Sequence, residues 1–140
     1  MNGFPSDLNL SYLVRRDLTF IGIDQFSLYL TLNAEVLSAD RGPTGILENA
    51  VMDSDVHIRI EGSWRLADGS GGLIDESMEH AERKSYQVHL LLGLKLLSYL
   101  VSSETTLKLT FEQGFCLSVI DDSEMYETVS IEYGETRIVV

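Results

Sequence analysis

Two runs of alternating apolar and polar residues, joined by three residues, dominate the second half of the chain. The runs are TLKLTF (106–111) and FCLSV (115–119), and the connection is EQG, which ends at Gly114. Successive side chains of a strand point to opposite faces, so the apolar residues of both runs share one face of a hairpin. A three-residue loop sets Leu109 opposite Leu117. It requires a type I turn followed by a residue with positive φ, which Gly114 supplies.

A similar pattern occurs earlier in the chain. The segment LVRRDLTFIGIDQFSLYLTL begins at Leu13, and LLGLKLLSYLVSSETTLKLTF begins at Leu91, so that Leu18 matches Leu96. Self-similarity of this kind indicates a duplicated unit. We therefore expect a single domain over residues 1–140, built from two pseudo-repeated halves at about 12–66 and 91–133.

The first half holds further strands and an insertion. Leu18 to Asp24 and Phe26 to Val36 are predicted to form a hairpin, and an insertion of roughly 37–55 follows, in which ILENAVM fits either a helix or a strand. The next strand places Ile58, Ile60, Trp64 and Leu66 on one face, so Trp64 is expected in the core. Gly62 interrupts this row, which indicates a bulge or a close backbone approach.

One helix is predicted from about Glu76 to Leu92. Its apolar residues recur at helical spacing, Asp75 or Ser77 can cap its start, and Gly93 is suited to its end. The predicted fold is therefore α+β: a mainly antiparallel sheet from two similar β-halves joined by one helix.

Composition narrows the class of partner. The chain has 140 residues, a net charge of −12 and a single cysteine, Cys116. One cysteine forms no intramolecular disulfide, which is typical of a reducing cytosol, and we expect neither a secretion signal nor a membrane span. The negative charge disfavours nucleic acid and anionic membranes, and it favours a basic protein. We therefore expect a cytoplasmic protein.

An acidic corner near the C-terminus is the candidate binding site. Asp122, Glu124 and Glu127 are predicted to lie on the surface and to meet a partner, whereas Asp121 is expected to bind backbone amides. The corner has Tyr126 at the sixth position, where a calcium loop needs glycine, and Glu132 at the twelfth, and no helix pair flanks it. His57, His80 and His89 are interpreted as surface residues, and we expect no metal and no cofactor.

Several motifs resemble a family of small, uncharacterised bacterial proteins that includes immunity proteins of polymorphic toxin systems. The motifs are LLG (91–93), LKLTFEQG (107–114), LSVIDDSEMYE (117–127) and, in the first half, IRIEGSW (58–64). Arg15 departs from the pattern, because this family usually has glycine there. The resemblance implies a non-catalytic binding protein and supplies no catalytic residues.

Two interpretations of function follow. The first is a non-enzymatic protein-binding domain, an immunity protein that neutralises a cognate toxin by occupying its surface. The alternative is a structural or regulatory module that forms a homodimer through an exposed sheet edge. An enzyme is disfavoured, since the sequence shows neither a nucleophile with its base nor a set of metal ligands.

Overall fold

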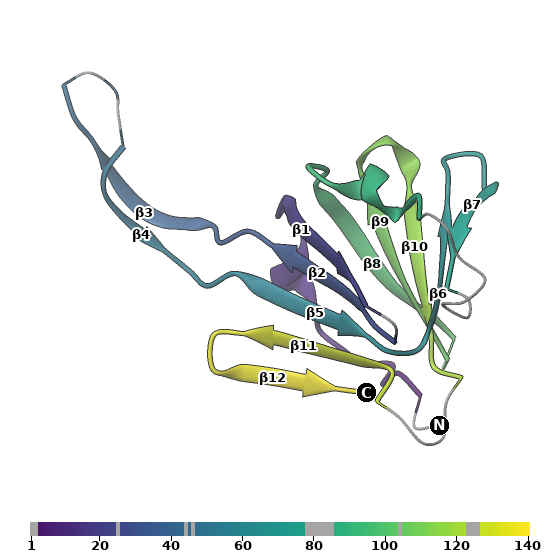
Figure 1. Cartoon of the computed structure of the whole chain (residues 1–140). Coiled ribbons are helices and arrows are strands. Elements are labelled where there is room, and N and C mark those ends of the chain that lie inside the picture. Colours follow the sequence, from purple (N-terminus) through teal and green to yellow (C-terminus); the bar gives the residue numbers. More distant parts are fainter. Residues whose placement is uncertain are drawn as a thin grey trace.

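A computed structural model describes residues 3–24, 26–43, 45, 47–77, 86–103, 105–122 and 127–140. These residues form two five-stranded antiparallel sheets and a separate two-stranded ribbon (Figure 1). The first sheet has the order β1 (Leu18–Ile23), β2 (Leu28–Leu32), β5 (Val56–Ile60), β11 (Val129–Tyr133), β12 (Thr136–Val139). The second has the order β7 (Leu73–Glu76), β6 (Ser63–Ala67), β10 (Cys116–Ile120), β9 (Thr106–Phe111), β8 (Leu96–Ser103). The ribbon pairs β3 (Val36–Arg41) with β4 (Leu47–Met52), and 3₁₀-helical turns occur at η1 (Ser11–Leu13), η3 (Val88–Leu91) and η4 (Glu112–Gly114).

The predicted C-terminal hairpin is confirmed in its register. Leu109 lies opposite Leu117 in the β9–β10 pair, and the apolar residues of both strands are buried. Gly114 has the expected positive φ of 80°, but Gln113 also has a positive φ, of 65°. The loop is therefore not the predicted type I turn, because two successive residues adopt left-handed conformations.

The strand predicted around Trp64 changes sheets in its middle. Ile58 and Ile60 lie on β5 in the first sheet, while Trp64 and Leu66 lie on β6 in the second, and all four are buried as expected. The chain bends at Gly62, where an added Cβ would lie 2.8 Å from the carbonyl oxygen of Ile120. Gly62 is thus a close backbone approach, and the bend directs the apolar faces of both strands into one core.

The two sheets are built in the same way from opposite parts of the chain. The first takes three strands from the first half (β1, β2, β5) and two from the second (β11, β12). The second sheet takes three strands from the second half (β8, β9, β10) and two from the first (β6, β7). The strands of the two halves can be matched in order, β1, β2, β5, β6 and β7 with β8 to β12. Under this matching, the strand order of one sheet reproduces the strand order of the other.

The segments that enter β1 and β8 share one backbone conformation. Each follows a 3₁₀ turn, and the residues at the matched positions both have positive φ, 74° at Arg15 and 87° at Gly93. The two segments also pair with each other, since the amide of Arg15 donates to Leu96 and the amide of Gly93 donates to Leu18. This pairing joins the edges of the two sheets.

The predicted α+β class is wrong, because the described residues are nearly all antiparallel sheet and none of their helical segments reaches seven residues. Glu76, the expected start of the joining helix, ends β7, which pairs with β6. The other end of the expected helix is the single turn η3, and residues 78–85 lie outside the described residues. The buried carboxylate of Asp75 accepts hydrogen bonds from the amides of Gln87 and Val88, at the start of η3.

Candidate functional site

The most unusual part of the molecule is the ribbon of β3 and β4, which projects from the two sheets as a long arm (Figure 1). Most of the segment ILENAVM lies in β4, so this segment is mainly a strand and not a helix. The arm connects β2 to β5 through residues 33–55. The matched connection, from β9 to β10, needs only the short loop around Glu112–Gly114. Since the same strand pairing closes without an arm in the second half, the fold itself does not require residues 36–52.

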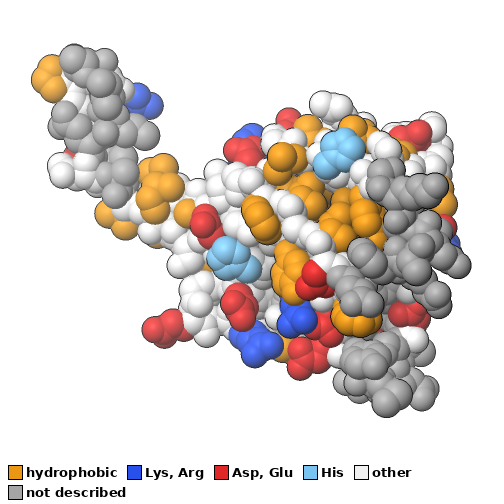
Figure 2. Space-filling model, in the orientation of Figure 1, with side chains coloured by type: hydrophobic (Ala, Val, Ile, Leu, Met, Phe, Trp, Pro, Cys, Tyr) orange, Lys and Arg blue, Asp and Glu red, His pale blue; other side chains and the backbone are white. Residues whose placement is uncertain are grey.

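Large apolar side chains of the arm are left in solvent. Val36, Leu37, Val51 and Met52 are each between 48% and 65% exposed, and Figure 2 shows hydrophobic side chains along the arm near its root. An isolated two-stranded ribbon is at best marginally stable in water. Clustered apolar side chains on an exposed element are typical of a surface that another protein covers.

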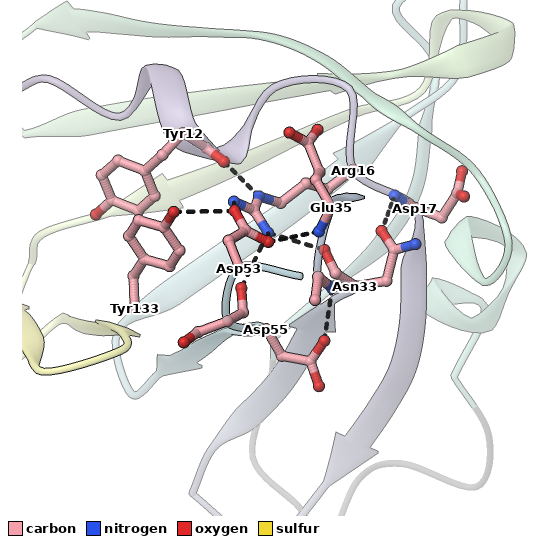
Figure 3. Close-up of polar contacts among 10 residues, drawn as sticks. Tyr12, Arg16, Asp17, Asn33, Glu35, Asp53, Asp55 and Tyr133 are labelled. Atoms are coloured by element: carbon pink, nitrogen blue, oxygen red, sulfur yellow. Dashed lines mark hydrogen bonds and ion pairs between the residues drawn. The ribbon is translucent and has the colours of Figure 1, made fainter. Parts of the chain in front are cut away.

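A buried arginine holds the root of the arm. Arg16 is only 2% exposed, and its Nη1 donates to the carbonyl oxygens of Asn33 at 2.9 Å and Ser54 at 3.0 Å (Figure 3). The same guanidinium forms an ion pair with Asp53, to which Nη1 donates at 3.2 Å and Nη2 also donates. Arg16 therefore contacts both chain segments that enter the arm.

Asp53 holds the root of the arm from the other side, and Arg16 and Asp53 together are called the anchor of the arm. Its carboxylate accepts hydrogen bonds from the hydroxyl of Tyr133 at 2.9 Å and from the amide of Glu35, and its own amide donates to the carbonyl of Glu35 at 2.9 Å. The hydrogen bonds from Arg16 lower the pKa of Asp53 to about 2. The carboxylate is thus charged at neutral pH and ties β11, the root of the arm and Arg16 together.

Two aromatic rings lie against the anchor. Tyr12 stacks on Tyr133 with 4.8 Å between ring centroids, and the guanidinium of Arg16 lies 5.0 Å from the centroid of the Tyr133 ring. Burial raises the pKa of Tyr12, whose hydroxyl is buried without a hydrogen-bond partner among the described residues. These contacts fix the root of the arm, because the polar groups of Asp53 and Arg16 are engaged in hydrogen bonds that hold the chain.

The acidic corner is only partly described. Asp122 is exposed and accepts a hydrogen bond from the hydroxyl of Ser63, and Glu127 is exposed with a carboxylate oxygen 3.9 Å from Nη2 of Arg137. Glu124 lies outside the described residues. The structure leaves the role of these three residues in partner binding a prediction.

Asp121 differs from its acidic neighbours. It is buried, and its carboxylate accepts hydrogen bonds from the amide of Gly3 at 2.6 Å and from the hydroxyl of Thr128. The expectation that Asp121 binds a backbone amide is confirmed, although the amide comes from the opposite end of the chain. Asp121 therefore ties the N-terminal segment to the end of β10.

A hollow of about 580 Å³ lies on the outer face of the first sheet. Aromatic and charged side chains line it, among them Phe20, Tyr29, His57, Arg59 and Arg137. The charged groups are largely occupied, since Arg59 pairs with Glu61 at 2.9 Å and lies over the ring of Tyr29.

The histidines were interpreted as surface residues. His57 and His89 are exposed, and His80 lies outside the described residues. Within the described part of the chain, no three His, Cys, Asp or Glu side chains are grouped as a metal site would need. No helix there is long and apolar enough to cross a membrane.

The chain matches no protein-family model, and it shows no significant similarity to a curated protein or to a solved structure. The candidate site therefore rests on its own geometry. The arm was anticipated as an insertion, but its anchor was not. The one local signal of the anchor was Arg16, a charge close to the apolar residues Leu13 and Leu18 that are buried in the core.

Proposed function

We propose that this chain is a non-enzymatic protein-binding domain whose β3–β4 arm makes the main contact with its partner. The observation that carries the proposal is the comparison of the two halves. One half closes the strand pair with a short loop, and the other inserts an anchored arm with exposed apolar side chains in the same place. An element that the fold does not need, and that exposes apolar surface to water, is best explained by binding.

The partner that fits best is a basic protein. The net charge of −12 gives the whole molecule a negative potential, which accelerates encounter with a cation-rich surface. The sequence motifs that resemble immunity proteins support a narrower form of the proposal, in which the partner is a toxin domain and the chain blocks its surface in the cytosol.

The test removes the arm and keeps its anchor. Residues 36–52 are replaced by Asn-Gly, a pair suited to a two-residue hairpin turn, so that Glu35 and Asp53 remain cross-strand neighbours. The trimmed chain should keep the unfolding midpoint of the wild type within a few degrees. It should fail to protect cells that express the cognate toxin, whereas the full chain protects them.

A matched control separates the apolar surface from the length of the arm. Leu37→Ser with Val51→Ser leaves the ribbon in place and removes two exposed apolar side chains. Protection by the trimmed chain equal to that of wild type would contradict the arm as the main contact. A full chain that neither protects cells nor binds the toxin, yet self-associates, would favour the homo-oligomeric module instead.

The acidic corner has its own test against the same partner. Glu124→Lys with Glu127→Lys should lower the association rate and flatten its salt dependence, because charge steering acts on encounter. Asp122 is retained in this variant because it accepts a hydrogen bond from Ser63. If the variant and the wild type associate at equal rates at every ionic strength, the acidic corner is only solvated surface and does not steer binding.

A further inference from the structure

The outer strands of the two sheets differ in charge. Natural sheets protect their edges with charged residues or proline, because an unpaired edge can accept a strand from another molecule. β7 carries Asp75 and Glu76, and β12 carries Arg137. The other two outer strands, β1 (LTFIGI) and β8 (LLSYLVSS), have neither a charge nor a proline.

β8 is the longer of the two uncharged edges, with eight residues against six in β1. After Leu96, one side of the β8 backbone is hydrogen-bonded to β9. The other side forms no backbone hydrogen bond with any residue that the structure describes. The pairing with β9 is irregular near both ends of β8, but Ser98 to Val101 lie in regular register. Leu97 and Leu100 are 49% and 58% exposed, so this edge offers both free peptide groups and apolar side chains.

The charges beside β8 identify the molecule that suits this edge. Leu100 lies opposite Lys108 across the sheet, and Lys95, just before β8, forms an ion pair with Asp17 at 2.8 Å. The carboxylate of Glu112 also lies here, since it accepts a hydrogen bond from the amide of Lys95 at 2.6 Å, so Lys95 and Lys108 offset the charges of Asp17 and Glu112 beside β8. A basic partner would be attracted elsewhere, whereas a second copy of this chain meets no like charge if it pairs here.

We propose that two copies of this chain associate through β8, antiparallel and about a twofold axis, so that the second sheets of both molecules form one continuous sheet. Such a contact is self-complementary, because each copy offers the same strand to the other. Leu90 and Leu92 of the neighbouring η3 region are also exposed, and Figure 2 shows hydrophobic side chains gathered on this side of the body. The arm projects away from β8 and stays available to a different partner (Figure 1).

The test is the mass of the full chain in solution, measured by sedimentation velocity over a range of concentrations. The interface variant is Leu100→Glu, whose carboxylate lies opposite Lys108 within the monomer and so supports the strand pairing of its own sheet. In the dimer the two new carboxylates face each other near the twofold axis. Like charges so placed cost several kcal/mol, so dimerisation should weaken by more than about a hundredfold.

Leu73→Glu is the matched control. Leu73 is 58% exposed, as Leu100 is, but it lies on β7 at the opposite edge of the same sheet. The proposal expects a dimer for wild type and for Leu73→Glu, and a monomer for Leu100→Glu with an unchanged thermal midpoint. A monomeric wild type at all concentrations, or a dimer that persists in Leu100→Glu, would overturn it.

The chain with residues 36–52 replaced separates this proposal from the proposed function. It should remain a dimer although it no longer binds the toxin. Loss of the dimer on trimming would place the contact between copies in the arm and would refute the assignment to β8. Capture of a different, strand-donating protein by monomeric wild type would also refute it, since the edge would then serve a foreign chain.

Discussion

Substitution of Asp53 by asparagine is the most direct test of how the arm is held. Asp53→Asn keeps the size of the side chain and an oxygen that can accept the hydrogen bond from Glu35. It removes the negative charge beside Arg16, which is 2% exposed. Arg16 then keeps only its hydrogen bonds to the carbonyl groups, including those of Asn33 and Ser54, in a place that water hardly reaches.

The expected loss follows from two estimates. Breaking a buried ion pair by removing one partner costs about 3–5 kcal/mol, because the remaining charge is uncompensated. The pKa of Asp53, lowered from 3.8 to about 2, corresponds to about 2 kcal/mol of stability at neutral pH. Because Arg16 retains its carbonyl partners, we expect Asp53→Asn to lower the free energy of unfolding by about 2–4 kcal/mol.

Urea denaturation followed by circular dichroism, at pH 7 and in steps down to pH 2, measures this difference. A carboxylate with a lowered pKa contributes stability above its unfolded value, near 4, and loses that contribution as the pH falls through its folded value. The difference in unfolding free energy between wild type and Asp53→Asn should therefore shrink between pH 4 and pH 2. A loss below about 1 kcal/mol at pH 7, or one that does not change with pH, would refute the anchor as described.

Three further predictions concern the core and the backbone, and each is measured by urea denaturation at pH 7. Gly93→Ala should cost about 1 kcal/mol, because its φ of 87° strains any side chain in otherwise open space, whereas Arg15→Gly should cost nothing. Gly114→Ala should cost more than Gly93→Ala, since its Cβ would also lie 2.8 Å from Cα of Gly69; equal losses would contradict this close approach. Trp64→Ala should cost about 3–5 kcal/mol, because Trp64 is buried and packs near Tyr86, and a stable variant that fails to bind the toxin would instead make Trp64 an interface residue.

The parts of the fold that were predictable are those in which local pattern and burial agree. The β9–β10 hairpin has one strictly alternating apolar face and a glycine at its turn, so its register followed from the sequence. Gln113 was not predictable, because nothing in its residue type indicates a positive φ. The joining helix was predicted from the spacing of Met78, Ala81, Val88 and Leu91. Met78 and Ala81 lie outside the described residues, while the spacing of Val88 and Leu91 fits a single 3₁₀ turn as well as an α-helix.

Neither the anchor nor the arm could be predicted from local sequence patterns, and the reasons differ. Arg16 and Asp53 are 37 positions apart, and an ion pair over that separation leaves no periodic signal in the sequence. None of the described side chains of β3 and β4 belongs to the core, so these strands lack the buried apolar face that would make their alternation clear. Its exposed residues, such as Leu37, look from the sequence like those of an ordinary insertion.

The exchange of strands between the halves has a consequence for how the chain folds. While a ribosome makes the first half, β5 and β6 both lack a neighbour, because β11 and β10 are not yet synthesised. The two pairings that join the halves, β5–β11 and β6–β10, must therefore wait for the last quarter of the chain, and such distant contacts form slowly. A chain divided between residues 77 and 86 should accordingly give two fragments that are unfolded when separate and that regain the native circular dichroism spectrum when mixed.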